Sequence, residues 1–217
     1  CGNDYIFFDN RDGKVASPGS LCVSLCDWHY GIGGYGIVLM EHSDVADAKM
    51  RIFNRDGTEG GMAGNAIRCM GKYLYDKGIV KKDYMTIETA GGIKSLLIYT
   101  RNGKANTVSV GMGKADLDAL SLPGATIINR PVEIAGGTYN ITCASVGNPH
   151  CVVFCEDPSV LDLETLGPQF EHAKYFPDRI NTEFVRIVNE NTLRMRVYER
   201  GNGETVACGT GACAACL

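Results

Sequence analysis

The sequence contains no long hydrophobic run and no excess of basic residues. No apolar stretch approaches the ~18 residues that a membrane-spanning helix needs, so we expect no membrane partner. The net charge of −4 and the pI of 5.6 provide no basic surface for a phosphate backbone, so we expect no nucleic-acid partner. With 45% hydrophobic and 21% charged residues, the 217-residue chain has the composition of a soluble globular protein.

Marks of a metal site, a disulfide framework or a pyridoxal phosphate enzyme are also missing from the sequence. The pair Cys22-x3-Cys26 has no partner pair and His29 stands alone, so we predict no metal site. No residue marks a Schiff-base lysine or a phosphate cup, and we predict no cofactor. Because the chain lacks a signal-like start, its ten cysteines indicate a reducing, cytoplasmic compartment rather than a secreted disulfide scaffold.

Both ends of the sequence indicate a partial chain. It begins at Cys1 rather than at methionine, and it ends at Leu217 inside the helix expected to run on from Gly209. We expect the missing segments to remove strands and to leave sheet edges unpaired.

One segment occurs twice, with one chemically important difference. The first copy is Glu59-Gly60-Gly61-Met62-Ala63-Gly64-Asn65-Ala66, and the second is Glu204-Thr205-Val206-Ala207-Cys208-Gly209-Thr210-Gly211. Each follows a turn rich in glycine. The second copy offers a thiol where the first offers a methyl group, which indicates a two-sided active site with one side vacant.

The pattern of apolar residues predicts an α+β protein with two similar domains, residues 1–112 and 113–217. The clearest helix is 65–77, where Ile67, Met70, Gly71 and Leu74 recur at helical spacing before Gly78. Further helices are expected at 20–28, near 168–173 and from Gly209. Strands are expected at 6–9, 36–40, 49–53, 84–89, 94–100, 107–111, 131–135, 138–146, 150–155, 182–188 and 192–199, with a linker rich in Asp, Ala and Leu after Gly113.

The repeated segment begins a helix in each half, and a helix start has useful chemistry. Its free N–H groups can bind a carboxylate, and its partial positive charge can lower the pKa of Cys208 from ~8.5 towards neutrality. Two such helix starts facing each other would present one base to each side of a carbon. Such an arrangement can invert a stereocentre, since one group removes the proton and the other returns it.

Several motifs in order are similar to those of one enzyme family. They are Cys1-Gly2-Asn3-Asp4-Tyr5, Gly31-Ile32-Gly33, Phe53-Asn54-Arg55-Asp56-Gly57, Gly64-Asn65, Gly147-Asn148-Pro149-His150, Arg179-Ile180-Asn181 and Tyr198-Glu199-Arg200 leading into Ala207-Cys208-Gly209-Thr210-Gly211-Ala212-Cys213. The chain resembles diaminopimelate epimerase, a cofactor-independent two-cysteine enzyme, over essentially its whole length. The resemblance implies two pseudo-symmetric domains, each a mostly antiparallel β-barrel around a central helix, with substrate in the cleft between them.

The resemblance also implies the activity and the site residues. The activity is interconversion of LL- and meso-diaminopimelate, a small-molecule amino-acid substrate, in lysine and cell-wall precursor synthesis. Cys208 matches the second catalytic cysteine, and His150 and Glu199 match the polar pair that assists the thiols. The substrate-binding positions that match are Asn3, Asn54, Gly64, Asn65, Asn148, Asn181, Glu199, Arg200, Gly209 and Thr210. The oligomeric state stays open between a monomer and a homodimer.

Three positions depart from the family pattern. Ala63 stands where the family has its first catalytic cysteine, and Cys69 lies too far along the same helix to replace it. Tyr35 stands where the family more usually has an acidic residue, and Trp28 is unusual for its loop. We expect the change at Ala63 to impair inversion in this form of the enzyme.

Other functions fit parts of the pattern. A related cofactor-independent racemase could act on another amino acid, and a non-catalytic amino-acid-binding protein could have kept the cleft after losing one base. A cysteine hydrolase using Cys208 and His150 would leave the doubled helix start unexplained.

Overall fold

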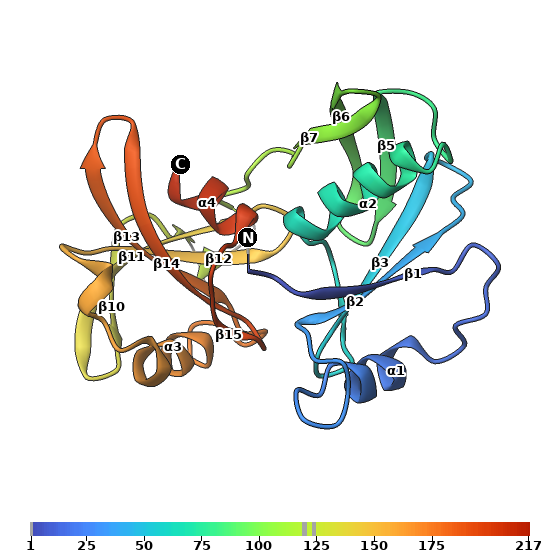
Figure 1. Ribbon diagram of the computed structural model, residues 1–217. Coiled ribbons are helices and arrows are strands. Elements are labelled where there is room, and N and C mark those ends of the chain that lie inside the picture. The colour runs from blue at the N-terminus through green and yellow to red at the C-terminus, as the bar shows by residue number, and fades with distance from the viewer. Residues whose placement is uncertain (1, 119–120, 123–124) are drawn as a thin grey trace. The chain divides into compact units, whose positions relative to one another are not determined.

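The computed structural model describes residues 2–118, 121–122 and 125–217. The chain divides into two compact units, one spanning Asn3–Gly113 and the other spanning Lys114–Leu217 together with Gly2. In Figure 1 the first unit runs from blue to green and the second from yellow-green to red. Positions 119–120 and 123–124 of the linker predicted after Gly113 lie outside the described residues.

The first unit is a mostly antiparallel sheet with one helix on each face. Its strands follow the order β1-β2-β3-β5-β6-β7, and β4 pairs with β3. The strands are β1 (Tyr5–Asp9), β2 (Gly36–Glu41), β3 (Ala48–Asn54), β4 (Glu59–Gly60), β5 (Tyr84–Thr89), β6 (Gly92–Arg101) and β7 (Lys104–Val110), and the helices are α1 (Pro18–Leu25) and α2 (Gly64–Asp76).

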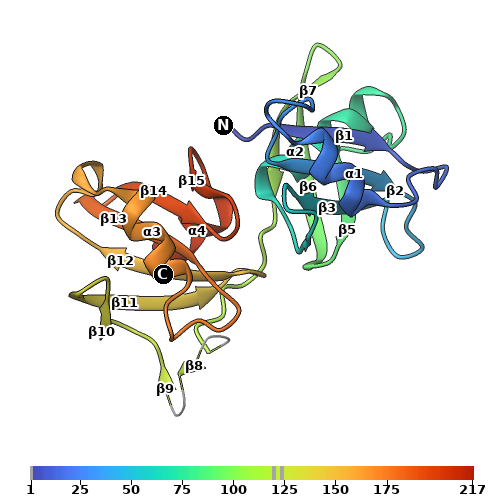
Figure 2. The same ribbon diagram turned by 90° about the horizontal axis from the view of Figure 1, so that it is seen from below.

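The second unit has the same α+β character. Its strands follow the order β10-β11-β12-β13-β14-β15, and a separate hairpin of β8 and β9 stands apart from that sheet in Figure 2. The strands are β8 (Ser121–Leu122), β9 (Ala125–Thr126), β10 (Arg130–Ile134), β11 (Gly137–Ser145), β12 (Pro149–Phe154), β13 (Asn181–Asn189), β14 (Thr192–Glu199) and β15 (Gly203–Thr205). The helices are α3 (Leu163–Glu171), α4 (Gly209–Ala215) and a short 3₁₀ turn at Pro158–Val160.

Strand register shows that the two units repeat one another. The parallel pair β1–β2 aligns Tyr5 with Gly36, and the parallel pair β12–β13 aligns His150 with Asn181. Each residue of the second pair lies 145 positions after its counterpart in the first. The same offset relates the antiparallel pair β2–β3 to β13–β14, and the pair β3–β4 to β14–β15. It also relates the first residue of α1 to that of α3, and the first residue of α2 to that of α4. The pseudo-symmetry predicted from one short segment therefore extends from β1 to the start of α2.

A bidentate ion pair also occurs once in each unit. Arg51 on β3 reaches Glu59 on β4 with Nε–Oε1 and Nη2–Oε2 distances of 2.7 and 2.8 Å. Arg196 on β14 reaches Glu204 on β15 with the same two distances. Each pair joins a very short strand to its longer neighbour with two parallel hydrogen bonds.

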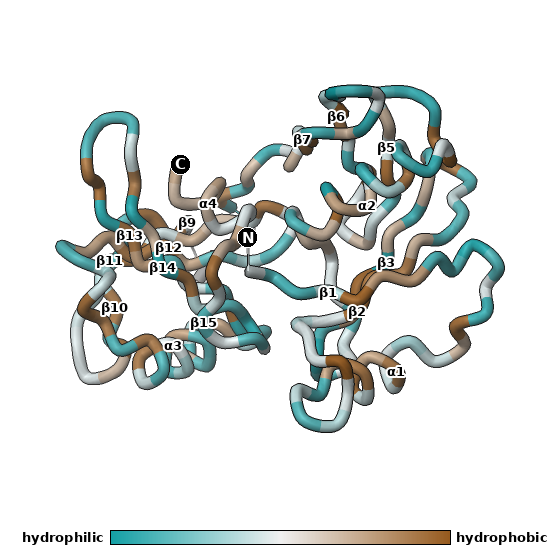
Figure 3. The backbone as a smooth tube through the Cα atoms, in the orientation of Figure 1, coloured by the Kyte–Doolittle hydropathy of each residue, from teal (hydrophilic) through white to brown (hydrophobic). Residues whose placement is uncertain are grey.

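The first unit buries its sheet on both sides. Val38 and Met40 on β2 belong to the core beneath α2, whereas Ile37 and Leu39 pack with the α1 side. Because both faces are covered, β2 is a continuous apolar run, which appears as hydrophobic colouring along β2 in Figure 3. In the second unit the main cluster lies between the sheet and α3 and includes Phe184.

The elements agree with most of the sequence-based predictions, with three differences. The helix predicted at 20–28 lies earlier, at Pro18–Leu25, because Pro18 stands at its first position and Cys26 caps its end. The predicted helix at 168–173 is wrong at its start, because α3 begins at Leu163 behind Asp162, whose side chain accepts a hydrogen bond from Thr165 N–H, and Pro168 lies inside the helix. The short strands β4, β15, β8 and β9 are additional. None of the described helices is long and apolar enough to cross a membrane.

Close packing between α3 and β14 leads to a stability prediction. A Cβ added at Gly167 would lie 2.1 Å from Cδ2 of Tyr198, so the Tyr198 ring would have to move. We expect Gly167→Ala to lower the free energy of unfolding by about 1–3 kcal/mol. Urea unfolding followed by circular dichroism measures the change. Gln169→Ala, at an exposed position of the same helix, is the control and should stay within about 0.5 kcal/mol.

Candidate active site

Cys208 lies between β15 and α4, at the point where the second copy of the repeat becomes helical. It is the N-cap residue of α4, with φ −124° and ψ 112°. The Gly211 N–H donates a hydrogen bond to Cys208 Sγ at 3.4 Å, and Thr210 Oγ1 lies 3.4 Å from the same sulfur. The thiol therefore stands at the end of the helix where free N–H groups collect.

A histidine and two carboxyl groups lie around this thiol, and each comes from a different strand. Donor atoms of His150 on β12, Glu183 on β13 and Cys208 all lie within 4.8 Å of one another. Glu199, the last residue of β14, accepts a hydrogen bond from Thr205 Oγ1 on β15. The pairing of β12 through β15 thus collects four acid–base groups of the second unit at the start of α4.

His150 and Glu183 form a fully buried pair. Both side chains have 0% exposure, and His150 Nδ1 lies 2.7 Å from Glu183 Oε1. His150 Nε2 lies 2.9 Å from Asn148 Oδ1. Imidazole, carboxylate and thiolate can each ligate a metal, but the 2.7 Å separation is that of a direct hydrogen bond. Two ligands at ~2.0–2.2 Å from one tetrahedral zinc ion would stand further apart than this.

The pKa of the Cys208 thiol shifts in the direction opposite to the prediction. Burial, followed by the nearby carboxylates of Glu199 and Glu183, raises this pKa to about 12, and the contacts from Thr210 and Gly211 lower it by less. Burial likewise raises the pKa of Glu199 and of Glu183. The expectation of a lowered thiol pKa is therefore wrong for this unit, because the helix start is outweighed by loss of solvent and by two carboxylates.

Two other predicted residues of the second unit, Asn181 and Arg200, lie where β13 begins and just after β14 ends. Asn181 Nδ2 donates to the Pro149 carbonyl at 2.7 Å, and Asn181 Oδ1 accepts from the Arg200 N–H at 3.0 Å. Arg200 Nη1 donates to the Asp178 carbonyl at 3.1 Å. Asn181 is therefore hydrogen-bonded both to the first residue of β12 and to Arg200, which follows β14. Arg200 is held by two hydrogen bonds, one from its backbone N–H and one from its guanidinium. Around Gly209, the other predicted residue here, a Cβ would meet no atom within 4 Å.

The first unit has the same backbone at its helix start but different side chains. Ala63 is the N-cap residue of α2 with φ −134° and ψ 113°, close to the values at Cys208. Asn65 donates to Asn3 Oδ1 and accepts from Arg68. Asn54, which occupies the position equivalent to Glu199, donates to Thr58 Oγ1 at 3.1 Å. Gly64 follows Ala63 as the first residue of α2.

The two unusual aromatic residues of the first unit contact each other. The rings of Trp28 and Tyr35 meet edge to face with centroids 6.2 Å apart. Trp28 also covers Gly33, where φ is +83° and an added Cβ would lie 2.5 Å from the indole. Glycine is therefore required at position 33 both by its backbone conformation and by the neighbouring ring.

Sequence reasoning missed Glu183 and Thr205. A signal for Glu183 exists, since a fully buried glutamate is unusual and this one stands directly before the apolar pair Phe184-Val185 of a predicted strand. The repeat gives a second signal, because the residue 145 positions earlier is Val38.

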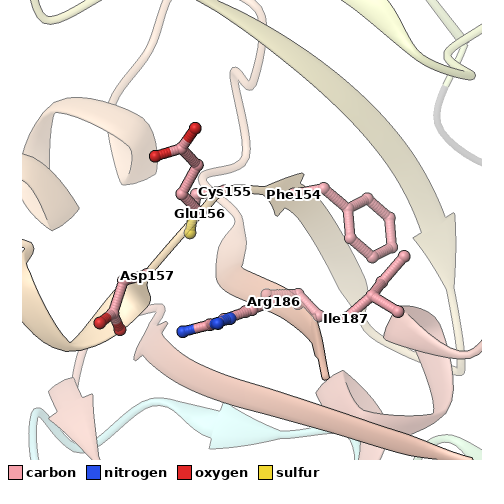
Figure 4. Close-up of a pocket in the computed structure, with 7 residues that line it drawn as sticks. Phe154, Cys155, Glu156, Asp157, Arg186 and Ile187 are labelled. Carbon is pink, nitrogen blue, oxygen red and sulfur yellow. The ribbon is translucent and has the colours of Figure 1, made fainter. Parts of the chain in front are cut away.

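A separate cavity of about 750 Å³ lies beside the end of β12 and the middle of β13, and it contains none of the predicted site residues. Figure 4 shows its lining, with Arg186 directed towards the side on which Asp157 lies. The pKa of Asp157 is lowered mainly by hydrogen bonds from Ser159 and further by Arg186. The only thiol of this lining, Cys155, has a pKa raised by burial. We assign no reaction to this cavity.

The raised thiol pKa predicts slow alkylation of Cys208. At pH 9, below the thiol pKa of about 12, we expect iodoacetamide to modify Cys208 later than the exposed Cys69. Glu199→Gln removes one of the charges that raise this pKa and should accelerate the reaction about tenfold, because a larger fraction of the thiol is then ionised at pH 9. Peptide mass spectrometry measures each rate. Glu204→Gln, which removes an exposed carboxylate bound to Arg196, is the control, and equal acceleration by both variants would contradict the assignment.

Comparison with known proteins agrees with this geometry. The family model described as diaminopimelate epimerase matches residues 1–117 and 142–217. A diaminopimelate epimerase of Methanococcus maripaludis is 47% identical over 217 residues, which cover 98% of this chain and 78% of that protein. The corresponding enzyme of Desulfovibrio desulfuricans is 45% identical over 223 residues, with the same coverage.

One solved structure shows the same fold at low sequence identity. A probable proline racemase from Agrobacterium radiobacter superimposes with a TM-score of 0.73 at 16% identity, covering 94% of this chain and 66% of that one. The fold is thus of the epimerase and racemase type, and the sequence match covers nearly the whole chain. The chain belongs to the diaminopimelate epimerase family.

Proposed function

We propose that this chain is an isomerase that interconverts LL- and meso-diaminopimelate by proton transfer at the α-carbon, without a cofactor. The observation that carries the proposal is the Cys208 thiol at the start of α4, surrounded by His150, Glu183 and Glu199. An equivalent helix start, capped by Ala63, occurs 145 residues earlier. Inversion needs two acid–base positions, and the repeat supplies two equivalent ones.

The substrate is a zwitterion, and the proposed contacts fit its groups. The reacting carboxylate would accept hydrogen bonds from the N–H groups at the helix starts, at Gly64 and Asn65 and at Gly209 and Thr210. The distal carboxylate would bind the Arg200 guanidinium, which can hold two carboxylate oxygens at once. The side chains of Asn3, Asn54, Asn148, Asn181 and Glu199 would hold the amino groups and orient the reacting carbon.

The protonation state of the Cys208 thiol decides which role it would have in proton transfer. With a pKa of about 12, Cys208 keeps its proton at neutral pH and is ready to act as the acid that delivers a proton. The partner base would have to stand at position 63, where alanine has no acid–base group. We therefore infer that this form inverts its substrate poorly, and that only slow exchange through the small fraction of Cys208 thiolate remains.

Incubation with each diaminopimelate stereoisomer in deuterated water tests the function. We expect slow incorporation of deuterium at the α-carbon with little inversion, and calorimetry should show binding of both stereoisomers. Preferential binding and exchange of proline, alanine or histidine would instead support a related racemase. Binding of diaminopimelate without any exchange would support a binding protein, and rapid inversion of both stereoisomers would contradict a vacant position at Ala63.

Two further proposals concern the cellular compartment and the oligomeric state of the protein. The nine cysteines of the described residues are all free thiols, which supports a reducing compartment such as the cytoplasm. A homodimer stays a prediction, which light scattering of the purified chain tests.

A further inference from the structure

The buried pair of His150 and Glu183 contains a group with no assigned role. Glu183 lies on β13 with its side chain completely buried, and its Oε1 lies 2.7 Å from His150 Nδ1, within hydrogen-bond distance. Its other oxygen, Oε2, is buried without a hydrogen-bond partner among the described residues. A buried carboxyl with one oxygen unsatisfied costs free energy, so packing alone does not account for its presence.

The first unit provides an internal comparison for this pair. The residues 145 positions before His150 and Glu183 are Tyr5 and Val38. Val38 is fully buried in the core beneath α2, in a sheet of the same register. The shared fold therefore forms with an apolar residue at this position. The glutamate occurs only in the unit that carries the thiol.

Glu183 also contacts the helix start directly. A Cβ added at Gly211 would lie 2.3 Å from Glu183 Oε1, so any larger residue there would displace the carboxylate. The N–H of the same Gly211 donates to Cys208 Sγ. The carboxylate is thus held between the imidazole on one side and the first turn of α4 on the other. The titratable groups that face this pair are Cys208, Glu199 and Cys151.

We propose that Glu183 is a positioning residue, whose contact with Nδ1 fixes the orientation of the His150 ring beside Cys208. Glu183 Oε1 at Nδ1 and Asn148 Oδ1 at Nε2 hold the two ring nitrogens in one defined arrangement. Its importance for catalysis rests on the proposed function. The orientation of the ring is a property of the free protein and can be measured alone.

Nitrogen NMR of the His150 ring tests directly whether Glu183 fixes the arrangement of the ring. We expect one set of ring-nitrogen signals, with a proton on Nδ1, in the unmodified chain. Glu183→Ala should give signals averaged over several ring arrangements, and Glu183→Gln should restore one set, because its amide oxygen still accepts from Nδ1. Glu133→Ala, at an exposed position of the same unit, should change nothing. An identical ring spectrum in the chain with Glu183→Ala would overturn the proposal.

Activity and stability measurements separate positioning from folding. In the Ala63→Cys background we expect Glu183→Ala to lower the turnover number about 10²-fold, as a small misplacement of a reacting group does, with KM little changed and most activity recovered by Glu183→Gln. The double variant His150→Tyr with Glu183→Val copies the first unit and should unfold at the same urea concentration as the parent. Marked destabilisation of that double variant would show that the pair serves the fold, which would also overturn the proposal. Because the ring spectra need no substrate, they remain decisive even if another substrate replaces diaminopimelate.

Discussion

Replacing Ala63 by cysteine is expected to raise the rate of interconversion of LL- and meso-diaminopimelate by about 10²–10⁴-fold, the usual contribution of one acid–base group. The backbone at Ala63 already has the conformation found at Cys208, with φ −134° and ψ 113° against −124° and 112°. A thiol introduced there needs no rearrangement of α2. Since Cys208 holds its proton at neutral pH, the new group would supply the base that the present chain lacks.

The measurement follows both inversion and α-hydrogen exchange, starting from each stereoisomer in deuterated water. Ala63→Ser is the matched control, because its hydroxyl can cap α2 but is a much weaker acid than a thiol. We expect no gain in rate from serine. A folded Ala63→Cys chain that binds diaminopimelate and inverts it no faster than the parent would refute the assignment of position 63.

Replacing Cys208 by alanine is expected to reduce the remaining α-hydrogen exchange at least about 10²-fold, because it removes the thiol that caps α4, and the equivalent residue at the start of α2 is Ala63. Alanine also removes the acceptor for the Gly211 N–H, so α4 should lose about 1 kcal/mol of capping.

Cys208→Ser separates these two effects. Serine can accept the hydrogen bond from Gly211, so the free energy of unfolding should stay near that of the parent while exchange falls as it does for alanine. Mass spectrometry follows deuterium uptake by diaminopimelate, and urea unfolding follows stability. Undiminished exchange in the alanine variant would show that another group removes the proton.

Much of the architecture can be predicted from local patterns, because α2 and the longer strands are set by the spacing of their own apolar residues. The repeat was visible in eight residues, and strand register extends it at a constant offset. Very short strands escaped prediction, since β4 and β15 contain too few residues to show any periodicity. Pro168 suggested a helix start, whereas Asp162 provides the actual cap.

The site is less predictable because its chemistry depends on neighbours from distant strands. The position of Cys208 at a helix start could be inferred from the adjacent glycines, but the direction of its pKa could not. That direction depends on Glu183 and Glu199, which lie 25 and 9 residues away in the sequence and reach the thiol only once β13 and β14 pair. Motif matching, in turn, finds residues that resemble a family pattern and passes over supporting residues such as Glu183.

The constant offset between the units has a practical consequence for protein engineering. Each side chain of the second helix start has a corresponding position in the first, on a backbone of the same register. Exchange of residues between these positions keeps the hydrogen-bonded ladders unchanged and alters only the chemistry that they carry. The molecule thus contains its own reference, in which the roles of His150, Glu183 and Glu199 can be judged against Tyr5, Val38 and Asn54, the uncharged residues at the corresponding positions of the same chain.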